Sequence, residues 1–178
     1  LSATWTVTGA GAFLLGKRGG KVRIPEVTAG KIVDYGVKDS LNMGACMAPA
    51  AADTIEQNLK DLKRKPEDYD RIITGDLGYV GKRLLLELLE EKGIGIEEQH
   101  MDCGIEIFDQ ESQDTHSGGS GCGCSAVTLA ALILPKLVSG EWKRVLFVPT
   151  GALLSTVSYN EGQSVPGIAH AVVLEHNE

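Results

Sequence analysis

The sequence predicts an α/β fold in which a mixed β-sheet is covered by helices. Segments with the pattern of strands alternate with segments that have the pattern of helices, an order typical of sheets with covered faces. Glycine is frequent, with 22 residues, and aromatic residues form only 5% of the chain, which favours closely packed α/β layers over an aromatic-rich β-sandwich. A length of 178 residues points to one domain with a sizeable core.

The expected strands are β-branched and apolar runs bounded by glycine, proline or aspartate. They are residues 3–16, 22–36, 69–78, 143–155 and 165–176. Pro25 indicates an edge position or an irregular start for the second run, because proline cannot donate to a strand ladder. Residues 98–110 have no clear period, and we expect a short strand or an irregular segment there.

Three segments have apolar side chains at helical spacing, and they are residues 40–65, 80–94 and 127–140. Asp39 or Ser40 is the expected cap of the first helix, and Pro49 marks its first turn or a kink. The second and third helices are expected to end at Gly93 and Gly140. The predicted apolar face of the first helix consists of Ala52, Ile55, Leu59 and Leu62.

Charge and hydropathy exclude several classes of function. The formal net charge is -7, which argues against a nucleic-acid-binding protein. Basic residues gather only in residues 16–21 and 59–65, which we interpret as solvated faces. No apolar run reaches the ~18–20 residues of a membrane span. The chain begins LSATWTVTG, without Met and without the basic start of a signal peptide, so we expect a piece of a longer protein.

The segment SGGSGCGCSA, residues 117–126, is the most unusual stretch, and we call it the glycine loop. Three interpretations are open. Cys122 and Cys124 could form a zinc site with His100 and Cys103, although this spacing matches no known finger or ribbon. A thiol at a helix start could act as a nucleophile. The glycine amides could instead hold an anion at the start of a helix.

The sequence also contains one weak internal repeat. Residues 11–15, GAFLL, resemble residues 170–174, HAVVL, and both follow small residues. Such an echo indicates a duplicated architecture of which one copy is mostly absent from this chain. The four cysteines are too sparse for a disulfide scaffold and indicate a reducing compartment.

Several motifs together carry a family resemblance. In order along the chain they are GKIVDYGVKD, NMGACMAPAA, ITGDLG, HMDCGIEIFDQ, GGSGCGCSA, TGALLS and GIAHAVVLE. This series resembles the stage V sporulation protein AD family of spore-forming bacteria, which is similar to the thiolases and condensing enzymes. The resemblance implies that the chain is the second half of a thiolase-like fold. Residues 1–16 would supply the last strand of the first half, and residues 22–178 would form the second half.

The resemblance also indicates where chemistry has been lost. Condensing enzymes carry a catalytic His where this chain has Gly75 and Asp76, and an Asn where it has Cys122. A carboxylate or a thiol cannot replace those hydrogen-bond donors. Asp76 is either a polar group at a pocket rim or a turn residue that caps the following helix. The candidate ligand-binding residues are Asp76, Gly119, Gly121, Cys122, Cys124, Ser155 and His170.

From the resemblance we expect a non-catalytic sporulation protein that binds dipicolinate, with or without calcium, for its uptake into the developing spore. Its expected partners are sporulation membrane proteins of the same operon, and its expected place is peripheral to the inner membrane of the forespore. We also expect a homo-oligomer or a complement with the absent half, no cofactor and no metal site. The alternative is a thiolase-type acyltransferase that uses Cys122 or Cys124 as its nucleophile.

Overall fold

The computed structural model describes residues 2–178 and contains three layers. The six-stranded central sheet has the order β2 (Val22–Arg23), β10 (Ala171–His176), β7 (Arg144–Val148), β4 (Arg71–Thr74) and β5 (His100–Asp102), and β3 (Val27–Thr28) also pairs with β10. Strand β4 is parallel to β5 and β7, whereas β10 is antiparallel to β7, β2 and β3. The predicted α/β class with a mixed sheet is therefore confirmed.

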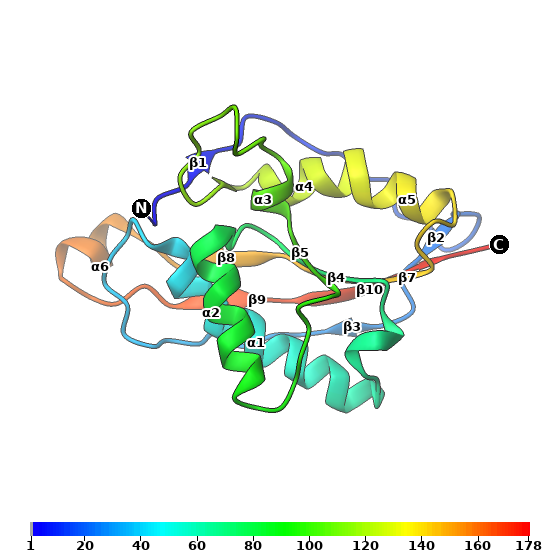
Figure 1. Ribbon diagram of the computed structural model, residues 1–178, viewed down its shortest axis with the longest axis horizontal. Coiled ribbons are helices and arrows are strands. Elements are labelled where there is room, and N and C mark those ends of the chain that lie inside the picture. Colours follow the sequence, from blue (N-terminus) through cyan, green and yellow to red (C-terminus); the bar gives the residue numbers. More distant parts are fainter. Residues whose placement is uncertain (1) are drawn as a thin grey trace.

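Helices cover both faces of this sheet (Figure 1). One face carries α1 (Met43–Leu62) and α2 (Gly78–Glu90), which follows η1 (Pro66–Asp68) and β4. The other face carries α3 (Cys103–Glu106) and a helix made of α4 (Cys124–Thr128), the π-helical segment Leu129–Ile133 and α5 (Leu134–Val138). The π-helical segment precedes Pro135, which has no N–H to give to the preceding turn.

The predicted helices are confirmed in position, with one change at a cap. In α1, Ile55 is fully buried and Leu59 nearly so, as the apolar face requires. The N-cap is Asn42, whose side chain accepts from Ala45 N, and neither Asp39 nor Ser40 has that role. Pro49 lies inside the helix.

The remaining short elements project from one end of the sheet. Strands β8 (Thr150–Ala152) and β9 (Gly167–Ala169) form an antiparallel pair that carries α6 (Thr156–Asn160) (Figure 1). Strand β1 (Trp5–Thr6) pairs in parallel with β6 (Gly119–Ser120) beside α4. This arrangement places the glycine loop at the end of the sheet where β4 and β5 finish.

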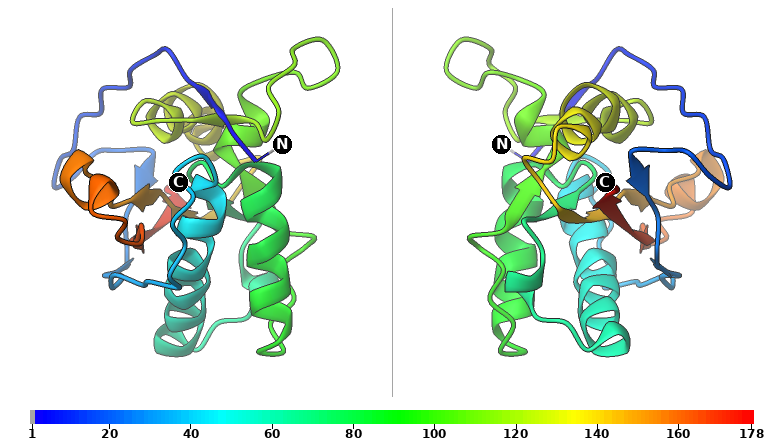
Figure 2. Two further views of the ribbon diagram at one scale, coloured as in Figure 1. Left: turned by 90° about the vertical axis from the view of Figure 1, so that its left-hand side faces the viewer. Right: turned by 90° about the vertical axis from the view of Figure 1, so that its right-hand side faces the viewer.

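The expected long strand at residues 3–16 is limited to β1. Residues 7–16 have no strand pairing, and in Figure 2 the following blue segment runs outside the helical layer. Leu14 is 100% exposed and Leu15 is 78% exposed. Strand backbone needs a pairing neighbour, and within residues 2–178 only β6 offers one to this segment. None of the helices described is both long and apolar enough to cross a bilayer.

Candidate functional site

A buried polar cluster lies where β4 and β5 end. Thr74 Oγ1 donates to Asp102 Oδ2 at 2.6 Å and lies 3.0 Å from His100 Nε2. Because the single hydroxyl proton is given to Asp102, His100 Nε2–H must donate to Thr74. His100 Nδ1 is then an unprotonated acceptor, and it is buried without a hydrogen-bond partner.

Asp102 joins three segments of the chain. Its Oδ2 also accepts from Leu77 N at 2.9 Å, and its Oδ1 accepts from Gly78 N and Gly104 N, both at 3.0 Å. Each carboxylate oxygen therefore accepts two hydrogen bonds. These hydrogen bonds come from the start of α2 and the start of α3, so this one side chain connects both helices to β4.

The start of α2 has a second set of partners in the glycine loop. Tyr79 N donates to Ser117 O at 2.9 Å, and Val80 N donates to Ser117 Oγ at 3.2 Å. Together with Asp102, Ser117 accepts from the amides that a helix leaves unpaired at its N-terminus. Asp76 does not take this capping role.

Burial shifts the titration of the cluster. Burial raises the pKa of Asp102 to about 6, and the hydrogen bonds from Thr74, Gly78 and Leu77 oppose this rise. Burial also lowers the pKa of His100 to about 3, and the positive charge of Lys82 adds to that effect. At neutral pH the pair is therefore a carboxylate and a neutral imidazole.

Asp76 links the glycine loop to β8. Its Oδ2 accepts from Gly121 N at 2.9 Å, and its Oδ1 accepts from Thr150 Oγ1 at 2.9 Å. Asp76 N lies 3.1 Å from the same hydroxyl. The side chain is only 8% exposed. Both carboxylate oxygens thus have partners within the chain.

Gly75 leaves no space for a side chain. A Cβ at this position would lie 2.6 Å from Thr150 N, 2.7 Å from Thr150 Oγ1 and 2.9 Å from Ser125 Oγ. Thr150 N belongs to the backbone and cannot rotate away. A histidine at position 75 would require the backbone of β8 to move.

The two cysteines of the glycine loop differ in environment. Cys122 is exposed, whereas Cys124 is fully buried and its thiol lies 3.7 Å from Gly75 O. Burial raises the pKa of Cys124 to about 12, and the negative charges of Asp76 and Asp102 contribute. Burial likewise raises the pKa of Cys103. Only Cys122 combines a loop position with access to solvent.

The glycines allow the N-terminal segment to lie against this helix start. Gly119 pairs with Trp5 in the β1–β6 ladder. A Cβ at Gly123 would lie 2.4 Å from Gly9 O, and a Cβ at Gly11 would lie 2.7 Å from Ala126 O. Glycine is needed on both sides for this backbone contact.

Two predicted residues make their hydrogen bonds elsewhere. Ser155 is the exposed N-cap of α6, where its Oγ accepts from Ser158 N at 3.1 Å. His170 is exposed, and its Nδ1 accepts from Gly30 N at 3.0 Å. Within residues 2–178, neither side chain has a hydrogen bond to the glycine loop.

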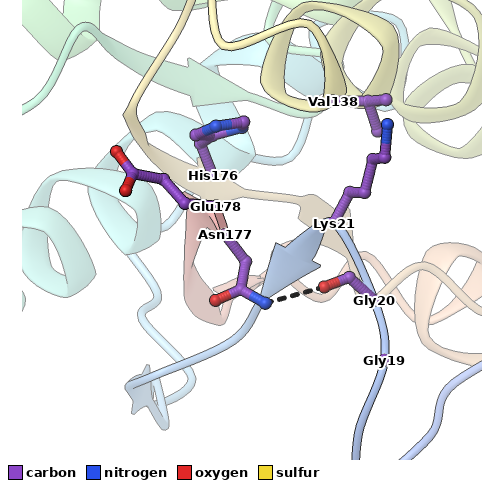
Figure 3. Close-up of a pocket in the computed structure, with 7 residues that line it drawn as sticks. All are labelled: Gly19, Gly20, Lys21, Val138, His176, Asn177 and Glu178. Atoms are coloured by element: carbon purple, nitrogen blue, oxygen red, sulfur yellow. Dashed lines mark hydrogen bonds between the residues drawn. The ribbon is translucent and has the colours of Figure 1, made fainter.

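The structure does not assemble the zinc set that the sequence allowed. Among the described residues, no three His, Cys, Asp or Glu side chains lie close enough together to hold a metal ion. A cavity of about 380 Å³ lies between the loop at Gly19–Lys21 and the C-terminal end of β10 (Figure 3). Lys21 and His176 are among the residues that line it, and none of the predicted site residues does.

Sequence reasoning missed the polar base of the site. Thr74, Asp102 and Thr150 were not among the candidates, and His100 was considered only as a zinc ligand, yet these residues hold Asp76 and the start of α2 in place. The signal was present as polar residues at the ends of short apolar strands. In open α/β sheets such strand ends are where ligands bind.

The chain is similar to known proteins over nearly its whole length. The family model described as stage V sporulation protein AD matches residues 1–175. The curated stage V sporulation protein AD of Bacillus subtilis (strain 168) is 45% identical over 174 residues. That alignment covers 98% of this chain and 51% of the relative, so the chain spans about half the length of the curated relative it matches.

Similar solved structures are thiolase-like enzymes. The tetronic acid condensing enzyme AbyA1 has a TM-score of 0.47 at 16% identity, and the match covers 90% of this chain and 49% of the AbyA1 chain. The 3-oxoacyl-[acyl-carrier-protein] synthase III of Aquifex aeolicus VF5 has a TM-score of 0.44 at 14% identity, with coverages of 89% and 46%. An acetyl-CoA acetyltransferase of Syntrophomonas wolfei has a TM-score of 0.34 at 20% identity, with coverages of 83% and 32%. With such scores, nothing about the chemistry of this chain follows from them.

Proposed function

The chain belongs to the stage V sporulation protein AD family, and from that premise we propose that it binds dipicolinate, with or without calcium, for uptake into the developing spore. The proposed role is binding without covalent chemistry. We propose the glycine loop as the ligand site, with the exposed Cys122 as its accessible side chain. Gly119, Gly121, Cys124 and Asp76 are buried or engaged within the chain and would position the loop. Ser155 and His170, whose hydrogen bonds lie elsewhere, are proposed as outer contacts.

One observation carries the non-catalytic part of this proposal. The slot at Gly75 is filled by Thr150 and Ser125, with 2.6 Å between a hypothetical Cβ and Thr150 N. Asp76, the next residue, has both carboxylate oxygens engaged by Gly121 and Thr150. A condensing reaction needs a hydrogen-bond donor here for the developing oxyanion. Neither residue supplies one from its side chain.

The start of the α4 helix supports the binding of a carboxylate. Backbone amides at the N-terminus of a helix attract anions, because they carry partial positive charge. In this chain the carboxylate of Asp76 already lies on Gly121 N, at 2.9 Å. We propose the adjoining amides of Cys122 and Gly123 as donors to a ligand carboxylate.

Partners and location follow from the family and remain proposals. We propose membrane proteins of the same operon as partners, and a position peripheral to the inner membrane of the forespore or spore. The exposure of Phe13, Leu14 and Leu15 favours a covering protein surface, either a second copy or the remainder of a longer family chain. On this view dipicolinate binds the 178-residue chain weakly.

Calorimetry and NMR together test the binding proposal. Dipicolinate is titrated into the 178-residue chain and into the longer Bacillus subtilis relative, with and without calcium. We expect heat with the longer protein, and chemical-shift changes at the amides of residues 121–123 in the short chain. Pyridine, which has the same ring without carboxylates, is the matched control ligand and should change neither signal. Absence of heat at millimolar dipicolinate with the longer protein would refute the proposal.

The acyltransferase alternative rests on Cys122, because the Cys124 thiol is buried and protonated. Incubation with an acyl-CoA thioester, followed by mass spectrometry, measures thiol acylation. We expect no turnover, and only slow modification of Cys122 that Cys122→Ser removes. Rapid acylation with repeated turnover would establish the enzyme and overturn the binding function.

A further inference from the structure

A second recess lies between the C-terminal ends of α1 and α2, and we call it the α1–α2 cleft. Its volume is about 600 Å³. Four cationic side chains line it, namely Lys60, Arg64, Lys65 and Lys92. The apolar residues Leu59, Pro66 and Ile94 also line it. An apolar wall with a few convergent polar groups is the usual composition of a small-molecule site.

The charge of this cleft opposes that of the whole chain. The chain has a formal net charge of -7, yet the cleft has four cations against two carboxylates, Glu56 and Glu67. Three of the cations come from the basic run at residues 59–65, and α2 is followed by the fourth, Lys92. We interpreted this basic run as a solvated face from the sequence. In the structure, three of its cations line a single recess.

Glu56 holds two of these ammonium groups together. Its Oε1 accepts from Lys60 Nζ at 2.5 Å, and its Oε2 accepts from Lys92 Nζ. Both hydrogen bonds lower the pKa of Glu56, which keeps its carboxylate ionised beside the two lysines. Each ammonium has three donors and uses one of them here. The remaining donors have no other hydrogen-bond partner among the described residues.

The other two cations differ in their freedom. Arg64 donates to Glu26 at 3.0 Å and lies 3.3 Å from Tyr69 Oη, so it forms a fixed wall. Lys65 has no ion pair within residues 2–178. Against the carboxylates of Glu56 and Glu67, the three lysines Lys60, Lys65 and Lys92 leave one excess positive charge.

We propose that the α1–α2 cleft binds a small organic anion whose carboxylate or phosphate lies beside Glu56 and accepts from the remaining donors of Lys60 and Lys92, and whose apolar body contacts Pro66 and Ile94. This site is separate from the glycine loop. The loop contacts the first turn of α2 through Tyr79 and Val80, and the cleft lies beyond its last turn. A 13-residue helix is about 20 Å long, and Figure 1 shows the two ends of α2 well apart.

The test uses phenyl phosphate as the probe and the 178-residue chain as the protein. Titration is followed by ¹H–¹⁵N NMR, and we expect shift changes at Lys92, Gly93, Ile94 and Gly95. Lys60→Gln combined with Lys92→Gln should weaken binding at least about tenfold, because two charge-assisted hydrogen bonds are lost. Raising the salt concentration should also weaken it.

The matched control is Lys17→Gln combined with Lys38→Gln, which removes the same charge from two exposed lysines that have no ion pair among residues 2–178. This variant should keep the affinity of the unaltered chain. Inorganic phosphate should bind more weakly than phenyl phosphate, since it has no apolar body. Equal loss in both double variants, or shifts confined to other residues, would overturn the proposal. Dipicolinate shifts at residues 121–123 should be the same in both double variants, which separates this site from the proposed function.

Discussion

Two parts of the candidate site differ in how their polar groups find hydrogen-bond partners: the base, formed by Thr74, His100 and Asp102, and the rim, formed by the glycine loop. At the base, Asp102 is 1% exposed and accepts four hydrogen bonds, from Thr74, Leu77, Gly78 and Gly104. At the rim, Cys122 is exposed and the glycine loop lies against the N-terminal segment.

This difference distinguishes the buried side chains that hold the site together from the exposed ones. The acceptors of Asp102 and Asp76 are used within the chain, so neither carboxylate is free to act as a base. Both carboxylates instead link segments of this chain that lie far apart in sequence. In the glycine loop, the side chain of Cys122 is exposed.

The largest expected effect is at the base. Asp102→Ala would leave four donors unpaired in a closed space, and we expect a loss of about 3–5 kcal/mol in the free energy of unfolding. Urea denaturation followed by circular dichroism measures this loss.

The control for Asp102 is Asp109→Ala. Asp109 also accepts hydrogen bonds, from Glu111 N and Ser112 Oγ, but it is exposed to solvent. Water replaces those bonds, so we expect a loss below about 1 kcal/mol. Similar losses in the two variants would mean that burial does not distinguish the base from an ordinary loop.

The second prediction concerns the closed slot between base and rim. Gly75→Ala places a Cβ within 2.6 Å of Thr150 N, and we expect a loss of about 1–3 kcal/mol in unfolding free energy. At Gly16 a Cβ would be 3.6 Å from Arg18 O, so Gly16→Ala should change stability by less than about 0.5 kcal/mol. A Gly75→Ala protein as stable as the Gly16→Ala protein would show that β8 yields easily and that the slot is open.

Local sequence patterns predicted the helices and strands, but they did not predict the hydrogen bonds between residues far apart in sequence. The apolar spacing of Ile55 and Leu59 located α1 correctly, because such spacing acts within one turn. The contacts of the site join residues far apart in sequence: Thr74 to Asp102, Asp76 to Gly121, and Asp76 to Thr150. No local pattern encodes them, so Asp76 was found only through its place in a family motif.

The N-terminal segment shows the opposite limit. Residues 11–15 have the composition of a buried strand, and in this structure they have no sheet to join. Strand formation depends on a pairing neighbour, so composition alone overestimated the regular structure there. The cap of α1 was predicted at the wrong residue because Asp39, Ser40 and Asn42 are all good capping residues and lie within one turn of each other.

The last prediction concerns a pH dependence of the base that is small in the unaltered chain. The pKa of His100 is lowered in the folded state to about 3, so the stability it contributes is lost as the pH falls from about 6.5 toward 3. The pKa of Asp102 is raised to about 6, so its contribution is present below about 3.8 and is lost as the pH rises toward 6. Between pH 4 and pH 6 the two slopes have opposite signs and largely cancel.

His100→Gln removes one slope and keeps a donor for Thr74. In this variant the Asp102 slope is unopposed, so unfolding free energy should rise by up to about 1.4 kcal/mol per unit as the pH is lowered from 6 to 4. The unaltered chain should change much less over the same range. Urea titrations at half-unit steps of pH compare the two proteins. If unfolding free energy depends on pH in the same way in both proteins, His100 has the same pKa in the folded and the unfolded chain. The base would then be open to water, and the contrast between base and rim would fail.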